Sequence, residues 1–294
     1  MPNDPTPIFE QHRPHLLALA YRMLGSHAEA EDVVQDTWLR QQHVDLGGLE
    51  FARAYLSRVA TNLCLDRLQS ARARREQYVG CWLPEPLEDM PSALDDGPQA
   101  QLEYAQNVSV AFMLALERLS PLERAAFLLH DVFDENFDEV ALRLGRSAAA
   151  CRQLATRART HVRTEQVRVD VQHEHAQQLL AAFVRTIQGG DVTALTQMLS
   201  QDAVMLSDGG GKVSSVAQPL HGGALIAKVL VGFTKPHDAN DFTLRFTFLN
   251  GLPAVVLSDT RGRVLQTTSL QVASDGRIDA VYVVRNPEKL ALIR

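Results

Sequence analysis

The sequence lacks most features that mark membrane, secreted or metal-bound proteins. No apolar run among its 294 residues approaches the roughly 20 residues of a membrane-spanning helix. Its start, MPNDPTPIFE, has neither the basic patch nor the apolar core of a secretory signal. The three cysteines, Cys64, Cys81 and Cys151, are far apart and form no CxxC pair, which argues against a thiolate zinc site and fits a reducing compartment. We therefore expect a soluble, cytoplasmic protein with no membrane partner, no metal and no cofactor.

The remaining composition is that of an ordinary globular protein. Hydrophobic residues make up 46% of the chain and charged residues 22%, with 17 glycines and 13 prolines. At about 150 residues per domain, the length predicts two or three domains, each large enough to bury its own core.

The net charge of −6 comes mostly from one short segment. Residues 76–104 hold seven acidic residues and no lysine or arginine. The same segment contains four prolines and no helical periodicity, so it is predicted to be a linker. The segments on either side are close to neutral, with arginines gathered near their ends. Such clusters are commonly solvated faces, and they also suit a nucleic-acid partner.

Residues 8–75 have the pattern of helices joined by short turns. Ala30, Val34 and Trp38 recur at helical spacing just after Glu29 and before a Gly47-Gly48 break. A longer helix is predicted to begin near Phe51. Its apolar stripe is Ala52, Leu56, Val59 and Leu63, and its other face carries Arg58, Thr61, Asn62 and Arg67.

Residues 136–163 predict a helix-turn-helix. A short amphipathic helix ends at Gly145, and Ser147 stands where it would cap the next helix. That second helix has an apolar stripe of Cys151, Leu154, Ala155, Ala158 and Val162 and an opposite stripe of Arg152, Thr156, Arg159 and Arg163. Such a helix can pack on its neighbour and present guanidinium groups to DNA. An ordinary helical hairpin with solvated arginines has the same pattern.

The last part of the chain, 172–294, predicts an α+β domain. It opens with an amphipathic helix whose stripe is Ala176, Leu179, Leu180, Phe183 and Ile187. Phe242, Leu244, Phe246 and Phe248 then alternate with polar residues, which predicts a half-buried strand. Residues 263–272 and 277–284 flank a Ser-Asp-Gly turn and predict a hairpin.

Several segments resemble those of a known family. AEAEDVVQDTWLR (28–40) and AYLSRVATNLCLDRLQSARAR (54–74) resemble the polymerase- and promoter-binding regions of bacterial extracytoplasmic-function (ECF) sigma factors. LSPLERAAFLLH and the helix-turn-helix after it resemble their second DNA-binding domain. YVGCWLPEP (78–86), DGGGK (208–212) and NPEKL (286–290) resemble motifs of the subgroup with a fused SnoaL-like C-terminal domain.

The resemblance implies a multidomain fold: two all-α helical domains for DNA and polymerase binding, the second a helix-turn-helix, then an α+β SnoaL-like cone-shaped domain with a curved antiparallel sheet. The implied boundaries are 1–75 for sigma region 2, 76–104 for the acidic linker, 105–168 for region 4 and 172–294 for the SnoaL-like domain. The implied partners are RNA polymerase core enzyme and promoter DNA.

The resemblance also implies individual site residues, by matching positions of this sequence to positions of the family. Core-polymerase binding is expected at Asp32, Gln35 and Asp36, on one exposed side of their helix. The minus-ten element is expected to meet Asn62 and Asp66 at its bases and Arg58 and Arg67 at its phosphates, followed by Arg72, Arg74 and Arg75. The minus-thirty-five element is expected to meet Arg152 and Gln153 at its bases and Ser147, Thr156, Arg157 and Arg159 at its phosphates.

The linker and the C-terminal domain are expected to meet. The resemblance places regulatory interdomain contacts at Tyr78, Trp82, Asp208, Gly210, Lys212, Asn286, Pro287 and Leu290. Activity would then be modulated in cis by the C-terminal domain, in place of a separate anti-sigma protein. In the family the acidic linker threads positively charged polymerase channels, which seven acids without a base would favour.

A different function stays open for the C-terminal domain. SnoaL-type cyclases use an acid–base pair in a conical pocket, and Asp208, His221 and Asp279 are candidate groups. The whole chain would then be a helix-turn-helix regulator fused to a SnoaL-type enzyme or ligand-sensing domain. The prediction is a chain that is not an enzyme, and a small-molecule effector of the C-terminal domain is left open.

Overall fold

The computed structural model describes residues 5–42, 44, 52–76, 78–88, 109–163, 173–234 and 242–293. The chain divides into two compact units. One consists of Met1–Gln77 and Ala111–Gln166 and is helical; the other consists of Tyr78–Val110 and Val167–Arg294 and contains the sheet. Most described residues of both predicted helical domains fall in the first unit, but Ser109 and Val110 fall in the second. Residues 78–88 of the predicted linker fall in the second unit, whereas Glu76 ends α3 in the first.

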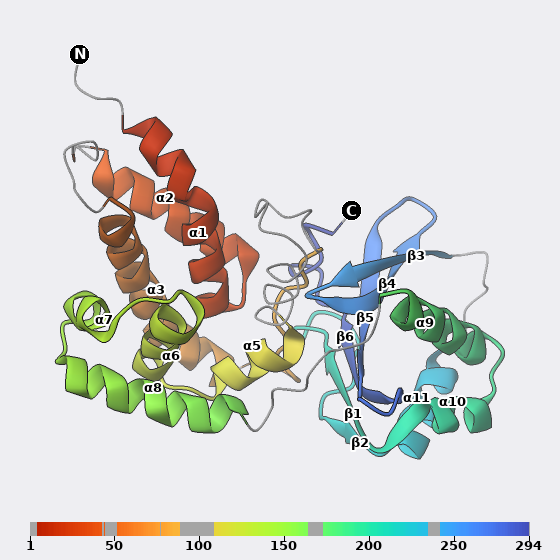
Figure 1. Ribbon diagram of the computed structural model, residues 1–294. Coiled ribbons are helices and arrows are strands. Elements are labelled where there is room, and N and C mark those ends of the chain that lie inside the picture. The colour runs from red at the N-terminus through yellow and green to blue at the C-terminus, as the bar shows by residue number, and fades with distance from the viewer. Residues whose placement is uncertain are drawn as a thin grey trace. The chain divides into compact units, whose positions relative to one another are not determined.

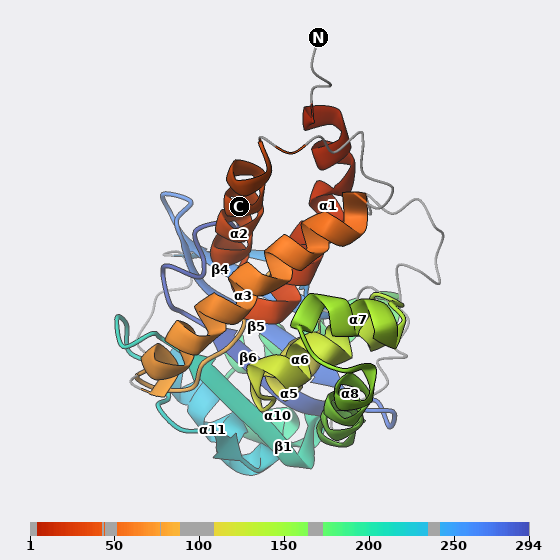
Figure 2. The same ribbon diagram turned by 90° about the vertical axis from the view of Figure 1, so that its left-hand side faces the viewer.

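The first helical module consists of α1 (Thr6–Leu24), α2 (His27–Gln41) and α3 (Ala52–Glu76), which pack against one another (Figures 1 and 2). Gly25 ends α1 in the left-handed conformation, and Ser26 caps α2 by accepting the backbone N–H of Glu29. The predicted apolar stripe of α3 faces inward, since Leu56 is fully buried and Leu63 is 5% exposed.

The second helical module consists of α5 (Val110–Glu117), α6 (Pro121–Phe127), the π-helical turn η2 (Leu128–Val132), α7 (Phe137–Leu144) and α8 (Ala148–Arg163). Ser120 and Glu123 form a reciprocal capping box at the start of α6. The helix-turn-helix prediction is confirmed: Gly145 ends α7 with φ of +61°, and Ser147 accepts the N–H of Ala150 at the start of α8.

The second unit is built on a six-stranded sheet with strand order β2-β1-β6-β5-β4-β3. The strands are β1 (Leu199–Asp208), β2 (Leu220–His221), β3 (Phe242–Leu249), β4 (Leu252–Asp259), β5 (Val264–Val272) and β6 (Ile278–Val284). The predicted hairpin is the antiparallel β5–β6 pair. All neighbouring strands are antiparallel except β1 and β6, which run parallel, so the sheet is not purely antiparallel as expected.

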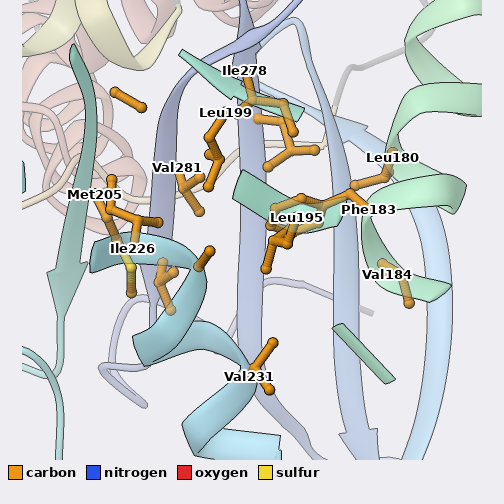
Figure 3. Packing of buried hydrophobic residues seen from close by; sticks show 14 of the residues in the cluster. Leu180, Phe183, Val184, Leu195, Leu199, Met205, Ile226, Val231, Ile278 and Val281 are labelled. Carbon is orange, nitrogen blue, oxygen red and sulfur yellow. The ribbon is translucent and has the colours of Figure 1, made fainter. Parts of the chain in front are cut away.

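The helices α9 (His173–Gln188), α10 (Val192–Met198) and α11 (Gly223–Thr234) accompany the sheet (Figure 1). Their apolar side chains meet those of the strands in one buried cluster that includes Leu180, Phe183, Ile226, Val281 and Met205 (Figure 3). The predicted stripe of α9 therefore faces the core. These side chains fill the space between helices and sheet.

The strand prediction for 242–248 is correct, but its half-buried character is not. Leu244 and Phe246 are 36% and 47% exposed on β3, a strand at the end of the sheet order whose ladder partner is β4 and whose Leu249 also bridges to Glu88. The alternation of apolar and polar residues shows which side chains lie on the same face of a strand. Whether other elements cover that face depends on where the strand lies in the folded domain.

Candidate functional sites

The residues expected to bind the polymerase lie on the outer side of α2. Asp32 and Gln35 are exposed and Asp36 is partly exposed, whereas Val34 is 2% exposed and packs inward. The Asp32 and Asp36 side chains are 67% and 44% exposed. All three side chains therefore lie on the solvent-facing side of α2, and the opposite side of the helix is buried.

Three of the four residues expected at the minus-ten element form one stripe on α3. Arg58, Asn62 and Asp66 are one helical turn apart and all exposed. Thr61, named beside Asn62 in the sequence pattern, is buried and donates to the Ser57 carbonyl oxygen. Phe51 and the side chains of Arg72, Arg74 and Arg75 lie outside the described residues.

Arg67 is oriented differently from that stripe. Its guanidinium lies against α2, with Nη2 2.8 Å from Asp36 Oδ2 and Nη1 3.4 Å from Asp32 Oδ2. Nη1 also donates to the backbone oxygen of Glu29 at 3.1 Å. The structure thus joins one expected DNA contact to two expected polymerase contacts.

The outer face of α8 carries most of the residues expected at the minus-thirty-five element. Ser147, Arg152, Gln153, Thr156 and Arg157 are all exposed. The opposite face is buried: Cys151, Ala155, Ala158 and Val162 are at most 1% exposed. Arg152 lies over the Phe137 ring of α7, 5.4 Å from its centroid, which sets the direction of its guanidinium near the start of the helix.

Two arginines of α8 have acidic neighbours that the helical pattern alone did not reveal. Arg159 is paired with Asp131 through two hydrogen bonds, from Nε at 2.6 Å and from Nη2 at 3.1 Å. Arg157 Nη1 lies 3.8 Å from Glu123 Oε1 and its side chain is 62% exposed. The stripe of α8 itself lacks acids, but the preceding α6 and η2 supply them.

Contacts between the two helical modules bury several charged groups. Arg124 of α6, whose side chain is 3% exposed, donates to the Met23 carbonyl at the end of α1 at 2.6 Å. It also donates to the Leu116 carbonyl and pairs with Glu117 at 2.8 Å. Burial lowers the pKa of Arg124 to about 9, so it stays charged at neutral pH and links the two modules.

His15 of α1 lies at the same junction. Its ring meets Phe133 edge-on at 4.9 Å, Nδ1 is 3.2 Å from Arg53 Nη2, and Nε2 is 3.1 Å from Ser57 Oγ. Burial, and then the nearby Arg53, lower its pKa to about 3. The ring is therefore neutral at physiological pH; because an arginine can only donate to Nδ1, Nε2 carries the hydrogen.

In the second unit, residues 78–88, which we call the strap, lie along the C-terminal domain. The Asp208 side chain at the end of β1 is fully buried and accepts four hydrogen bonds. Oδ1 accepts from Tyr78 Oη at 2.6 Å and Gly210 N at 3.0 Å. Oδ2 accepts from Leu83 N at 2.9 Å and Lys289 Nζ at 2.7 Å. Two of the four donors belong to the strap.

The neighbouring motif residues complete this site. Asn286 Nδ2 donates to Tyr78 Oη at 3.0 Å, and Gly210 has φ of +62°. A Cβ at Gly210 would lie 2.4 Å from Asn286 Nδ2, so a side chain there would displace the asparagine. Burial, and then the hydrogen bond to Asp208, raise the pKa of Tyr78, which keeps its hydroxyl protonated and donating.

Lys289 is the main residue of this site that sequence reasoning missed. Its ammonium lies 4.4 Å from the centroid of the Trp82 ring and 5.2 Å from that of Tyr78, and it also donates to the Leu83 carbonyl. Asn286, Pro287 and Leu290 of the same motif, NPEKL, were expected to make contacts, but Lys289 was not. The signal was present, since a lysine there could face two aromatics in an acidic segment.

A second anchor for the strap lies at the turn between β3 and β4. Leu87 N donates to Asn250 Oδ1 at 3.0 Å, and Asn250 N donates to the Leu87 carbonyl at 2.9 Å. Asn250 is 1% exposed with φ of +53°, a conformation that asparagine tolerates better than most residues. Glu88 pairs with Arg245 of β3. None of these four residues was singled out in the sequence.

The other expected regulatory residues are less buried. Lys212 pairs with Glu288, with side-chain exposures of 47% and 70%, and Pro287 is exposed. Leu290 is 4% exposed and packs within the domain. An open cavity of about 390 Å³ lies beside the strap, lined by Val79, Gly80, Gly211, Lys212, Val213, Ser214, Ser215 and Ala217.

The three candidate acid–base groups do not come together. His221 pairs across the sheet with Val204, four residues before Asp208, which is about 13 Å along a strand. Asp208 pairs with Val284, five residues after Asp279, which is about 16 Å along a strand. Asp208 is in any case bonded to the strap. Across the described ranges there is no group of three or more histidine, cysteine or acidic side chains that could hold a metal.

Comparison with known proteins agrees with this geometry. Residues 8–74 match the family model for Sigma-70 region 2, and residues 109–162 match that for Sigma-70 region 4. The ECF RNA polymerase sigma factor SigJ of Mycobacterium tuberculosis is 35% identical over 96% of this chain and 91% of the relative. The chain belongs to the ECF RNA polymerase sigma factors. SigG of the same organism is 34% identical over 66% of this chain and 59% of its own.

The crystal structure of M. tuberculosis SigJ is also similar to this ECF sigma factor as a whole. It has a TM-score of 0.74 and 31% sequence identity and covers 97% of this chain and 98% of its own. The expected fold class is therefore confirmed, and as a sigma factor the chain is a DNA-binding initiation factor. No helix in the described part of the chain is long and apolar enough to cross a membrane.

Proposed function

We propose that this ECF sigma factor binds core polymerase through α2 and reads two promoter elements through α3 and α8. The supporting observation is that α3 and α8 each present an exposed polar stripe opposite a buried apolar one. Arg58, Asn62 and Asp66 form the minus-ten surface, and Arg152 and Gln153 head the minus-thirty-five surface. Asp32, Gln35 and Asp36 form the polymerase surface. The site of action is then the cytoplasm, where the polymerase is.

The size of the compact helical unit limits how the two promoter elements can be bound at the same time. The two elements are centred about 25 base pairs apart, which is about 85 Å of duplex. A compact body of roughly 130 residues has a radius of gyration of about 14 Å and is about 36 Å across. The two reading helices cannot meet both elements while the modules stay packed. The contacts of Arg124 and His15 therefore hold a state that precedes promoter engagement.

We further propose that the C-terminal domain regulates the factor in cis by binding the strap and has no catalytic role. The strap lies between the two helical modules in the sequence, so its binding to the C-terminal domain restrains the segment that connects them. Asp208, Lys289 and Asn250 hold it at two places. An acidic linker that must enter a basic polymerase channel has to leave this position. The small-molecule effector stays a prediction that no observation here supports.

Initiation from a promoter library by the full chain with bacterial core enzyme tests the sigma assignment. Asn62→Ala removes an amide that can donate to and accept from a base edge, and we expect about tenfold less run-off transcript. Gln178→Ala on α9, an exposed amide in the other unit, is the matched control. Failure of the chain to co-elute with core enzyme would reject the proposed polymerase surface on α2, and full activity of the Asn62 variant would reject Asn62 as a minus-ten contact.

The regulatory proposal has a separate test. Asp208→Ala removes the acceptor that the strap shares with Lys289, and run-off output should then change relative to the wild-type chain. Arg277→Gln, which alters only an exposed pair at the turn between β5 and β6, should leave output as it is. Equal output from wild type and the Asp208 variant would reject regulation through the strap.

A further inference from the structure

The contacts of Arg67 with α2 carry an inference that rests on the proposed polymerase surface. We propose that Arg67 is a positioning residue for core binding: it holds Asp32 and Asp36 in the orientation that meets the polymerase, and it is not one of the phosphate contacts.

The geometry suits a bridge between helices. The guanidinium reaches three acceptors on α2: Asp36 at 2.8 Å, the Glu29 carbonyl at 3.1 Å and Asp32 at 3.4 Å. Its side chain is 25% exposed, less than either carboxylate. A planar fork of five N–H donors can span acceptors that lie one helical turn apart, which a single ammonium cannot do.

The bridge leaves both carboxylates able to bind a partner. Arg67 contacts Oδ2 of Asp32 and Oδ2 of Asp36, so Oδ1 of each can accept from an external donor. Fixing the two side chains before the partner arrives lowers the conformational entropy lost on binding. Arg67 would therefore strengthen core binding without contacting the polymerase.

The same contacts argue against a phosphate role. Arg58, Asn62 and Asp66 share one stripe of α3, and Arg67 is rotated about 100° from Asp66 around the helix axis. A phosphate would have to displace two carboxylates and a carbonyl oxygen to reach the guanidinium. Arg58 lies on the exposed stripe, and the structure assigns the phosphate contact there.

Fluorescence anisotropy of the labelled full chain with purified core enzyme measures the first consequence. Arg67→Gln should weaken core binding about three- to tenfold, and Arg67→Lys should recover less than half of that loss. Asp36→Asn should weaken core binding too, and the loss in the double variant should be smaller than the sum of the two single losses, because Arg67 acts partly through Asp36. Additive losses would overturn the positioning role.

The salt dependence of promoter binding measures the second consequence. With core at saturation, Arg67→Gln should leave the slope of log affinity against log salt as in the wild type. Arg58→Gln, the matched control on the exposed stripe, should reduce its magnitude by about one. An equal reduction in the Arg67 variant, with core affinity unchanged, would show a phosphate contact and overturn the proposal.

The Asp36 variant separates two failures. If Asp36→Asn leaves core affinity unchanged, the polymerase surface itself is misassigned and the positioning role falls with it. If Asp36→Asn weakens binding and Arg67→Gln does not, only the positioning role is overturned. Thermal unfolding of each variant, with Arg67→Lys retaining the charge, shows whether a loss reflects misfolding.

Discussion

Two polar sites of this sigma factor differ in where their partners come from. At the strap, Asp208 is fully buried and its four donors all belong to the same unit. On α8, Arg152 and Gln153 are exposed, and the helix directs them outward. A buried carboxylate tolerates burial only when its hydrogen bonds are made, whereas an exposed arginine stays solvated until DNA replaces the water.

The difference shows which site is intrinsic to the fold and which needs a partner. The strap site is complete in the chain alone, so its disruption should be visible in the isolated protein. The α8 surface contributes little to folding, so its substitution should be visible only with promoter DNA. The Glu135–Arg143 ion pair has features of both sites. Its side chains are buried, as at the strap, but Glu135 Oε2 has no hydrogen-bond partner among the described residues.

The largest expected effect is on the strap. Asp208→Ala leaves Lys289, Tyr78 and the Leu83 amide without their acceptor, which should weaken strap docking by about 3–5 kcal/mol. Fluorescence of Trp82 in a Trp38→Phe background measures docking, since Trp82 stacks on Lys289. Arg277→Gln is the control, because exposed pairs contribute at most about 1 kcal/mol. An unchanged Trp82 signal in the Asp208 variant would show that the strap is held elsewhere.

An effect of intermediate size is expected on the stability of the helical unit, from the titration of Glu135. Burial raises the pKa of Glu135 to about 7, with Arg143 opposing the shift, from 4.5 in the unfolded chain. The folded state therefore binds the proton more tightly, and its contribution to stability is full below pH 4.5 and lost as pH rises through about 7. The free energy of unfolding of the helical unit should therefore fall across that range.

Urea unfolding followed by Trp38 fluorescence in a Trp82→Phe chain measures this fall. Glu135→Gln cannot titrate and should flatten this part of the pH profile. A wild-type profile that rises with pH between 5 and 7, relative to the Glu135 variant, would contradict the prediction.

The smallest expected effect separates two arginines of α8. Arg152→Ala should reduce discrimination between minus-thirty-five sequences by about 1–3 kcal/mol. Arg159→Ala should weaken binding to all promoters about equally and flatten the salt slope, by at most about one because Asp131 already engages this side chain. Salt titrations of both variants on matched and mismatched promoters measure the difference. Identical behaviour would remove the division between base and phosphate contacts.

Local patterns were enough for much of the fold and of the exposed surfaces. The apolar faces of α3 and α8, the Gly145 turn, the Ser147 cap and the β5–β6 hairpin depend on residues close in sequence and formed as predicted, whereas Thr61, predicted on the outer face of α3, is buried. Exposure of Asp32, Asn62 and Arg152 followed from the same periodicity, because a side chain opposite a buried stripe faces solvent. Their roles with polymerase and DNA stay predictions.

Contacts between distant residues could not be predicted in the same way. The parallel β1–β6 pair and the exposure of Phe246 depend on strand order, which alternation does not encode. Asp131 and Arg159 are 28 residues apart, and Asn250 meets Leu87 from 163 residues away. No spacing rule links such positions.

The sequence by itself determined the helices, their polar and apolar faces, the acidic linker and the membership of this chain in the ECF sigma factors. The helices and their faces rest on residue type and short-range spacing, which fix local geometry before the chain is compact, whereas the family rests on the resemblance of several motifs. Only the tertiary structure decided that Arg67 faces α2, that Lys289 and Asn250 hold the strap, and that Asp208 is bonded to it rather than paired with His221. Such arrangements arise when separate elements pack and every buried charge must find its hydrogen bonds among the groups that packing brings near.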